Sequence, residues 1–116
     1  MSQAQASTPA LAELAAIIGH AEAQALARVF LQDTASLIRT LAAPCSTAIT
    51  PSAHLIAAHN LKSTAQLIGA YDLSTHAHDL ELRLKSGGSA PTRAELNTLH
   101  SDYQRIQQLL ASFVRT

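Results

Sequence analysis

Apolar side chains recur every three or four positions along most of the chain, which is the spacing of one face of an α-helix. Short segments rich in Pro, Gly, Ser and Thr separate these stretches and act as helix breakers. Because the connections are short, we expect neighbouring helices to pack against each other. The pattern predicts an all-α fold, an antiparallel four-helix bundle with a short additional N-terminal helix. The expected helices lie at about 9–18, 20–42, 51–69, 72–86 and from 93 onward.

Local signals mark where these helices begin. Thr8 and Thr50 each precede a proline, which suits an N-cap residue followed by the first helical position. Thr92 and Glu95 have the spacing of a capping box. The apolar periodicity also predicts which positions face the core. These are Leu11, Leu14 and Ile18, then Leu26, Phe30, Leu37 and Leu41, then Leu55, Ala58, Leu61, Ala65 and Ile68, then Leu73, Ala77, Leu80 and Leu84, and last Leu96, Leu99, Tyr103, Ile106, Leu110 and Phe113.

Composition narrows the class of protein. The 116 residues suit one domain over 9–116, preceded by a disordered tail over 1–8. The formal net charge is zero and aromatic residues make up 3%, so nucleic acid is not an expected partner. No apolar run is long enough to span a membrane. The single cysteine, Cys45, favours a cytoplasmic protein. Met1 and the chain end just after the last helix favour a free-standing protein, which we expect to be a monomer.

The helix expected at 51–69 has a polar face, although a helix packed in a core does not need such residues there. His59, Lys62 and Gln66 share a stripe that is displaced from the apolar stripe, with Ser63 beside it, and we expect His59 and Lys62 to face solvent. Reflecting position 59 about the following turn leads to Glu81. A carboxylate on one imidazole nitrogen orients the ring and leaves the other nitrogen as a nucleophile. An adjacent lysine would stabilise an arriving anion, so the pattern suits a histidine that accepts a phosphoryl group.

The residue types in the segment "AHNLKSTAQLIGAYDLSTHAHDLE" support a phospho-accepting histidine further than their spacing alone does. This segment resembles the central segment of histidine-containing phosphotransfer (HPt) domains, which have Ala-His-x-Leu-Lys-Gly/Ser, a Gly-Ala ten residues after the His, and a Leu-Glu in the next helix. Upstream, a glycine followed by a helix with a central Phe30 is also similar to the family. The residues in register are Ala58, His59, Leu61, Lys62, Ser63, Gly69, Ala70, Leu80 and Glu81.

The resemblance implies a role for each residue of the site. His59 matches the phospho-acceptor, and Lys62 matches the lysine that steadies the phosphoryl group. Ser63 takes a place where a small residue gives access, and Glu81 matches the position that hydrogen-bonds the acceptor ring. The implied function is a phosphorelay intermediate that takes a phosphoryl group from the aspartate of a receiver domain and passes it reversibly to another. No cofactor is expected on this chain, and the magnesium would belong to the receiver.

The partner surface is predicted beside the acceptor. Leu67 departs from the family pattern, in which a small polar residue is commoner, and with Ile56 and Ala70 it forms an apolar flank. Such a flank either packs against a neighbouring helix or docks the receiver, and Gln66 either contacts the phosphoryl group or the partner, or is solvated. The predicted receiver-contacting residues are Gln66, Leu67, Ile56, His78 and Lys85.

Other functions remain open at this level. A glycine-rich phosphate loop is missing, so we expect a phosphocarrier and not a kinase or other enzyme. A helical adaptor, or a metal-binding bundle built from the six histidines, is the alternative. No histidine pair has the i,i+4 spacing of a helical zinc site, although His59, His78 and Glu81 would converge. The expectation for His20, His54, His76 and His100 is simple solvation.

Overall fold

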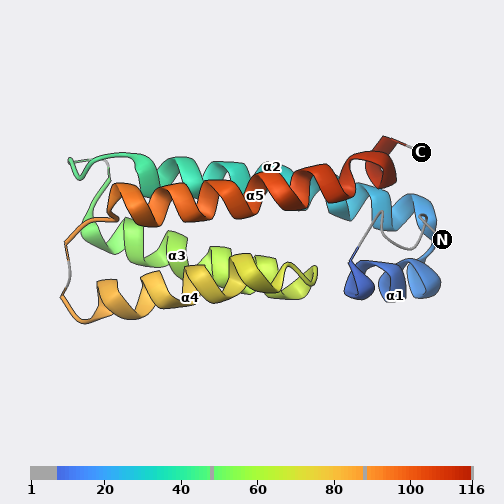
Figure 1. Ribbon diagram of the computed structural model, residues 1–116, viewed down its shortest axis with the longest axis horizontal. Coiled ribbons are helices and arrows are strands. Elements are labelled where there is room, and N and C mark those ends of the chain that lie inside the picture. The colour runs from blue at the N-terminus through green and yellow to red at the C-terminus, as the bar shows by residue number, and fades with distance from the viewer. Residues whose placement is uncertain (1–7, 48, 88, 116) are drawn as a thin grey trace.

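The computed structural model describes residues 8–47, 49–87 and 89–115, and it is helical over almost all of them (Figure 1). The predicted all-α fold is confirmed. Within these ranges no helix is both long and apolar enough to cross a membrane. The helices are α1 (Pro9–Ile18), α2 (His20–Ala42), α3 (Pro51–Leu67), α4 (Tyr71–Lys85) and α5 (Arg93–Arg115).

The helix starts follow the local signals in the sequence. The hydroxyls of Thr8 and Thr50 each accept a hydrogen bond of 3.1 Å from the backbone N–H three residues further on. At the start of α5, Thr92 N–H donates to Glu95 Oε1 (2.8 Å) and Glu95 N–H donates to Thr92 Oγ1 (3.1 Å). Thr8 is therefore an ordered, buried cap, and the rest of the predicted disordered tail lies outside the described residues.

The turn between α3 and α4 contacts the N-terminus of α1. Gly69 has φ +83°, a conformation that side chains rarely adopt, and α3 ends before it at Leu67. A Cβ atom at Gly69 would lie 3.0 Å from Ala10 Cβ and 3.1 Å from Thr8 Cβ. The Thr8 hydroxyl also donates to the carbonyl of Ile68. Glycine thus both permits the turn and lets the N-terminus of α1 pack on it.

The four longer helices lie lengthwise beside one another, and α1 lies at one end (Figure 1). Helix α3 packs against α4, α2 packs against both α3 and α5, and α4 also contacts α5. Helix α1 packs against α2. The molecule measures 45 × 23 × 19 Å, so one extended hydrophobic core runs between the long helices.

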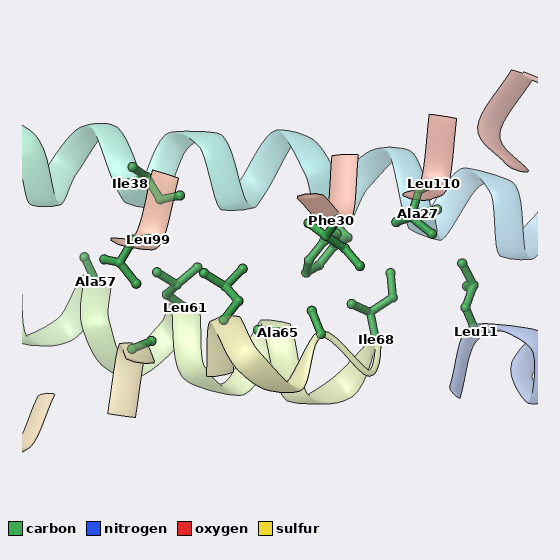
Figure 2. Packing of buried hydrophobic residues seen from close by; sticks show 14 of the residues in the cluster. Leu11, Ala27, Phe30, Ile38, Ala57, Leu61, Ala65, Ile68, Leu99 and Leu110 are labelled. Carbon is green, nitrogen blue, oxygen red and sulfur yellow. The ribbon is translucent and has the colours of Figure 1, made fainter. Parts of the chain in front are cut away.

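Figure 2 shows this core, to which every helix contributes. Most of the predicted core positions are buried or partly buried. Leu26 is an exception at 46% exposed, and Ile18 is also exposed. The buried stripe of α2 instead contains Ala23 and Ala27. Because α2 packs against three other helices, small side chains at these positions allow close approach, and the larger Leu26 is turned to the edge.

Candidate functional site

Helix α3 presents His59 and Lys62 on one face, as their spacing of three residues requires. The His59 side chain is 55% exposed. The Lys62 side chain is only 25% exposed, so the expectation that it faces solvent freely is wrong. It is drawn inward by a carboxylate from the neighbouring helix, whereas the imidazole remains accessible to a reacting partner.

Glu81 of α4 is that carboxylate. Its Oε2 lies 2.7 Å from Nδ1 of His59, and its Oε1 lies 3.0 Å from Nζ of Lys62. The contact expected across the α3–α4 turn is therefore present. The Glu81 side chain is only 4% exposed, which the sequence pattern did not show because position 81 lies beside the leucine stripe of α4. A second tie holds the two helices together at this level, since the Ser74 hydroxyl donates to the carbonyl of Lys62 (3.0 Å).

The ionisation of Glu81 determines which nitrogen of the neutral His59 ring carries the hydrogen. Burial acts to raise the pKa of Glu81, but the hydrogen-bonding contacts with Lys62 and His59, and the charges of those groups, outweigh it and lower the pKa from 4.5 to about 2. The carboxylate is thus ionised at neutral pH and only accepts hydrogen bonds. In the neutral ring of His59, Nδ1 therefore carries the hydrogen and donates it to Glu81, which leaves the lone pair on Nε2, on the opposite side of the ring.

Two further basic groups of α4 surround the same carboxylate. Nδ1 of His78 lies 3.8 Å from Glu81 Oε1, and Nζ of Lys85 lies 3.8 Å from Glu81 Oε2. Both side chains are about half exposed or more. This face therefore gathers positive charge around one buried negative charge, which favours an anionic ligand.

A shallow groove runs along the α3–α4 interface next to this cluster. Its lining residues are Lys62, Gln66, Tyr71, Ser74, Thr75 and His78. Two predicted receiver-contacting residues, Gln66 and His78, thus border the groove together with Lys62. Ser63 is exposed one position beyond Lys62 and presents only a small hydroxymethyl group to solvent.

The apolar flank lies on the surface, but with a different membership from the one expected. Leu67 is 84% exposed and Ile56 is also exposed. Ala70 is buried instead, because it lies at the tight turn into α4 and its N–H donates to the carbonyl of Ala65. Sequence reasoning missed two exposed apolar residues of α4, Tyr71 and Leu82. A helical projection of α4 would have placed both away from its leucine stripe.

Two histidines that were expected to be solvated have partners. His54 is 1% exposed. Its Nε2 lies 2.8 Å from the carbonyl of Ala43, and its Nδ1 lies 3.7 Å from Sγ of Cys45. The reason is that the segment between α2 and α3 folds back over the first turns of α3.

His76 pairs with a different helix, since its Nδ1 lies 2.5 Å from Oδ2 of the buried Asp102 of α5. The rings of His20 and Phe113 contact each other in a T-shaped arrangement, and His100 is exposed. Expected solvation was thus wrong for His54 and His76, whose partners come from distant parts of the chain. Among the described residues, no three His, Cys, Asp or Glu side chains gather in a way that would hold a metal ion.

The fold and the site together define a helical protein with an exposed imidazole that contacts a buried carboxylate and is flanked by a lysine. A comparison with protein-family models matches the Hpt domain over residues 11–109, nearly the whole chain. The chain belongs to the Hpt domain family, as its sequence resemblance to that family indicated. It is therefore a phosphocarrier of two-component phosphorelays, in which a histidine receives and passes on a phosphoryl group. Comparisons with curated proteins and with solved structures found no match.

Proposed function

We propose that His59 is the histidine that accepts the phosphoryl group from a receiver-domain aspartate and passes it to a second receiver. The observation that supports this assignment is the 2.7 Å contact between Glu81 and Nδ1 of an imidazole that is itself exposed. It leaves Nε2 as an accessible nucleophile in a fixed orientation. His76 also pairs with a carboxylate through Nδ1, but the cation at that carboxylate is Arg105, from the same helix as Asp102, and not a lysine on the histidine's own helix face.

The transfer step needs no proton movement on this chain. Nε2 of His59 attacks the phosphorus of the aspartyl phosphate, and the new N–P bond forms as the P–O bond to the aspartate breaks. The aspartate leaves as a carboxylate with the electron pair of that bond. Nδ1 keeps its hydrogen, and the positive charge gained by the ring lies against the ionised Glu81. Transfer to the next receiver is the same step in reverse.

The remaining site residues assist through charge and access. Lys62 provides a cation beside His59 for the oxygens of the transferring phosphoryl group, since such reactions depend on positioning and charge stabilisation. The small side chain of Ser63 leaves room for the receiver to approach. We propose that the receiver itself supplies the Mg²⁺ and the acidic residues that hold it.

We further propose that the receiver docks on the surface around the acceptor. Its members are the predicted contact residues Gln66, Leu67, Ile56, His78 and Lys85. The strong exposure of Leu67 and Ile56 beside the polar site supports this assignment, because exposed apolar side chains next to a functional site are suited to partner binding. The basic groups of His78 and Lys85 suit an acidic partner.

We also infer that α2, α3, α4 and α5 form an antiparallel four-helix bundle to which α1 is appended. The support is the reversal of chain direction between successive long helices, which the colour gradient of Figure 1 makes visible. Such an arrangement places the middle of α3 opposite the middle of α4, where His59 and Glu81 meet. We retain the expectation of a cytoplasmic monomer, for which the single cysteine supports the reducing compartment.

The assignment of His59 is tested by transfer from a phosphorylated receiver domain. We expect an acid-labile, base-stable phosphoryl label on the wild-type protein and none on His59→Gln. His100→Gln, which removes an exposed histidine of α5, is the matched control and should keep the label. A label that persists in a folded His59→Gln variant would overturn the assignment. The adaptor and metal-binding alternatives predict no covalent phosphate on the wild-type protein.

A further inference from the structure

Glu81 has two basic neighbours for each of its carboxylate oxygens. Oε1 faces Lys62 at 3.0 Å and His78 at 3.8 Å. Oε2 faces His59 at 2.7 Å and Lys85 at 3.8 Å. Each oxygen therefore has one close contact from a residue of α3 and one longer contact, at 3.8 Å, from a residue of α4. A single buried carboxylate does not require four basic partners, so the outer pair calls for an explanation.

Phosphorylation of His59 places a second anion within reach of Lys62. The phosphoryl group brings about two negative charges next to the ammonium group, which then has two anions to contact. If Lys62 moves toward the phosphoryl oxygens, Oε1 of Glu81 loses its nearest cation. This oxygen is buried, and Lys62 Nζ at 3.0 Å is its close partner among the described residues. Leaving a buried carboxylate oxygen without a partner is costly, and that cost would oppose the movement of Lys62.

We propose that His78 is the reserve partner of Glu81, which takes over Oε1 when Lys62 turns to the phosphoryl group. The inference rests on the proposed function of His59. His78 lies one helical turn before Glu81, already faces the same oxygen as Lys62 and borders the same groove. Its side chain is nearly half exposed, so it is free to shorten the 3.8 Å contact. Lys85 is not placed for this role because it faces Oε2, the oxygen that holds His59.

The role assigned to His78 is that of a positioning residue, which acts through Glu81 and Lys62. It predicts a stabilisation of the phosphorylated form in particular, because His78 makes only the longer contact before phosphorylation. Docking on the receiver, the role that the sequence predicts for His78, would have a different signature. A docking residue changes the rate of transfer but leaves unchanged the equilibrium between the separated phosphorylated and unphosphorylated proteins.

The deciding measurement is therefore the equilibrium distribution of phosphoryl groups between this protein and a receiver, at concentrations where the two are dissociated. The proteins to compare are the wild type, His78→Ala, Lys62→Ala and the double variant. We expect His78→Ala to shift the distribution roughly three- to ten-fold toward the receiver, and to cause no further shift when Lys62 is already absent. His78→Gln keeps an N–H donor and should restore part of the wild-type distribution.

His100→Ala removes an exposed histidine of α5 and serves as the control, with a wild-type distribution. An unchanged equilibrium in His78→Ala would overturn the proposal, and a slower rate in that variant would make His78 a docking residue. An equal shift with and without Lys62 would also overturn it, because His78 would then act on the phosphoryl group directly. Failure of the proposed function is distinguishable, since wild-type protein would then acquire no label on His59 at all.

Discussion

At the scale of single residues, Glu81 is the group on which the site depends. It is an acidic side chain removed from water in the contact between two helices, and it remains ionised because His59 and Lys62 both contact it. Its depressed pKa means that the folded protein binds this proton less readily than the unfolded chain. Its contribution to stability is therefore present above pH 4.5 and is lost as the pH falls toward 2.

Glu81→Gln should remove this pH dependence. For the wild-type protein, Glu81 contributes on the order of 3 kcal/mol to the free energy of unfolding at neutral pH, and this contribution disappears in acid. We expect wild type and Glu81→Gln to differ most at pH 7, to differ by roughly half as much at pH 3, and to converge only below pH 2. Urea unfolding at pH 7, 4.5 and 3 measures the difference.

Two features make this comparison specific. Glu95 contacts Arg83, which lowers its pKa as well, but this effect is common to both proteins and cancels in the difference. Asp79→Asn removes an exposed carboxylate of the same helix and should leave a curve parallel to that of the wild type. Parallel curves for Glu81→Gln would mean that the carboxylate is not held by its neighbours as the structure shows.

Lys62→Ala should affect both transfer and stability. Transfer from the receiver should slow by roughly ten-fold, because the cation beside the phosphoryl group is lost. The free energy of unfolding should fall by about 1 kcal/mol, since Lys62 is the nearest cation to the buried Glu81. Rapid-quench kinetics and urea unfolding test the two effects. Arg93→Ala, at an exposed basic position of α5, should change neither, and a wild-type rate in Lys62→Ala would remove the lysine from the mechanism.

At the scale of the helices, α1 is held to the turn between α3 and α4 through backbone proximity. Gly69 has no side chain, and Thr8 and Ala10 occupy the space that a Cβ atom would take. The Thr8 hydroxyl serves both as the N-cap of α1 and as a donor to the carbonyl of Ile68. One threonine and one glycine thus bring the N-terminus of α1 against this turn, in addition to the packing of α1 on α2.

Gly69→Ala tests this close approach, with Gly87→Ala as the matched control. Both glycines have a left-handed φ of about +80°, but nothing lies within 4 Å of the Cβ position at Gly87. Backbone strain alone should cost Gly87→Ala about 1 kcal/mol. Gly69→Ala should cost about 2 to 3 kcal/mol, because Thr8 and Ala10 must also be displaced. Thermal or urea unfolding measures both, and equal losses would mean that α1 does not pack closely on the turn.

At the scale of the whole molecule, the site around His59 and the helix α1 lie in different places. Helices α3 and α4 form the side of the molecule that holds His59, while α1 lies beyond the end of these two helices (Figure 1). Leu67, at the last position of α3, is one of the most exposed apolar side chains in the described part of the chain. An apolar residue so exposed adds nothing to the core, which agrees with its place in the proposed receiver interface.

Leu67→Glu should weaken receiver binding by roughly ten-fold while leaving the free energy of unfolding unchanged. The reason is that the substitution places a charge in the proposed interface but removes no buried contact. Val29→Glu makes the same kind of change at an exposed position of α2, away from the site, and should bind like the wild type. Calorimetric titration with a receiver domain decides between them, and equal affinity for both variants would exclude Leu67 from the interface.

Helix positions and the pairing of α3 with α4 were predictable from the sequence. The capping residues Thr8, Thr50 and Thr92 act within three positions of themselves, so their effect is visible locally. A short turn at Gly69 leaves little choice of register, which is why position 81 was expected opposite position 59. These features depend on interactions between residues close in sequence, or on a connection too short to allow alternatives.

Only the tertiary structure decided which polar residues are buried and what they contact. His54 and His76 have the same local surroundings as a solvated histidine, and their partners, Ala43 and Asp102, lie 11 and 26 positions away. The burial of Glu81 and the exposure of Leu26 depend in the same way on where neighbouring helices lie. Helix periodicity ranks positions by direction around one axis, whereas burial depends on the other helices that cover each direction, and that information is spread over the whole chain.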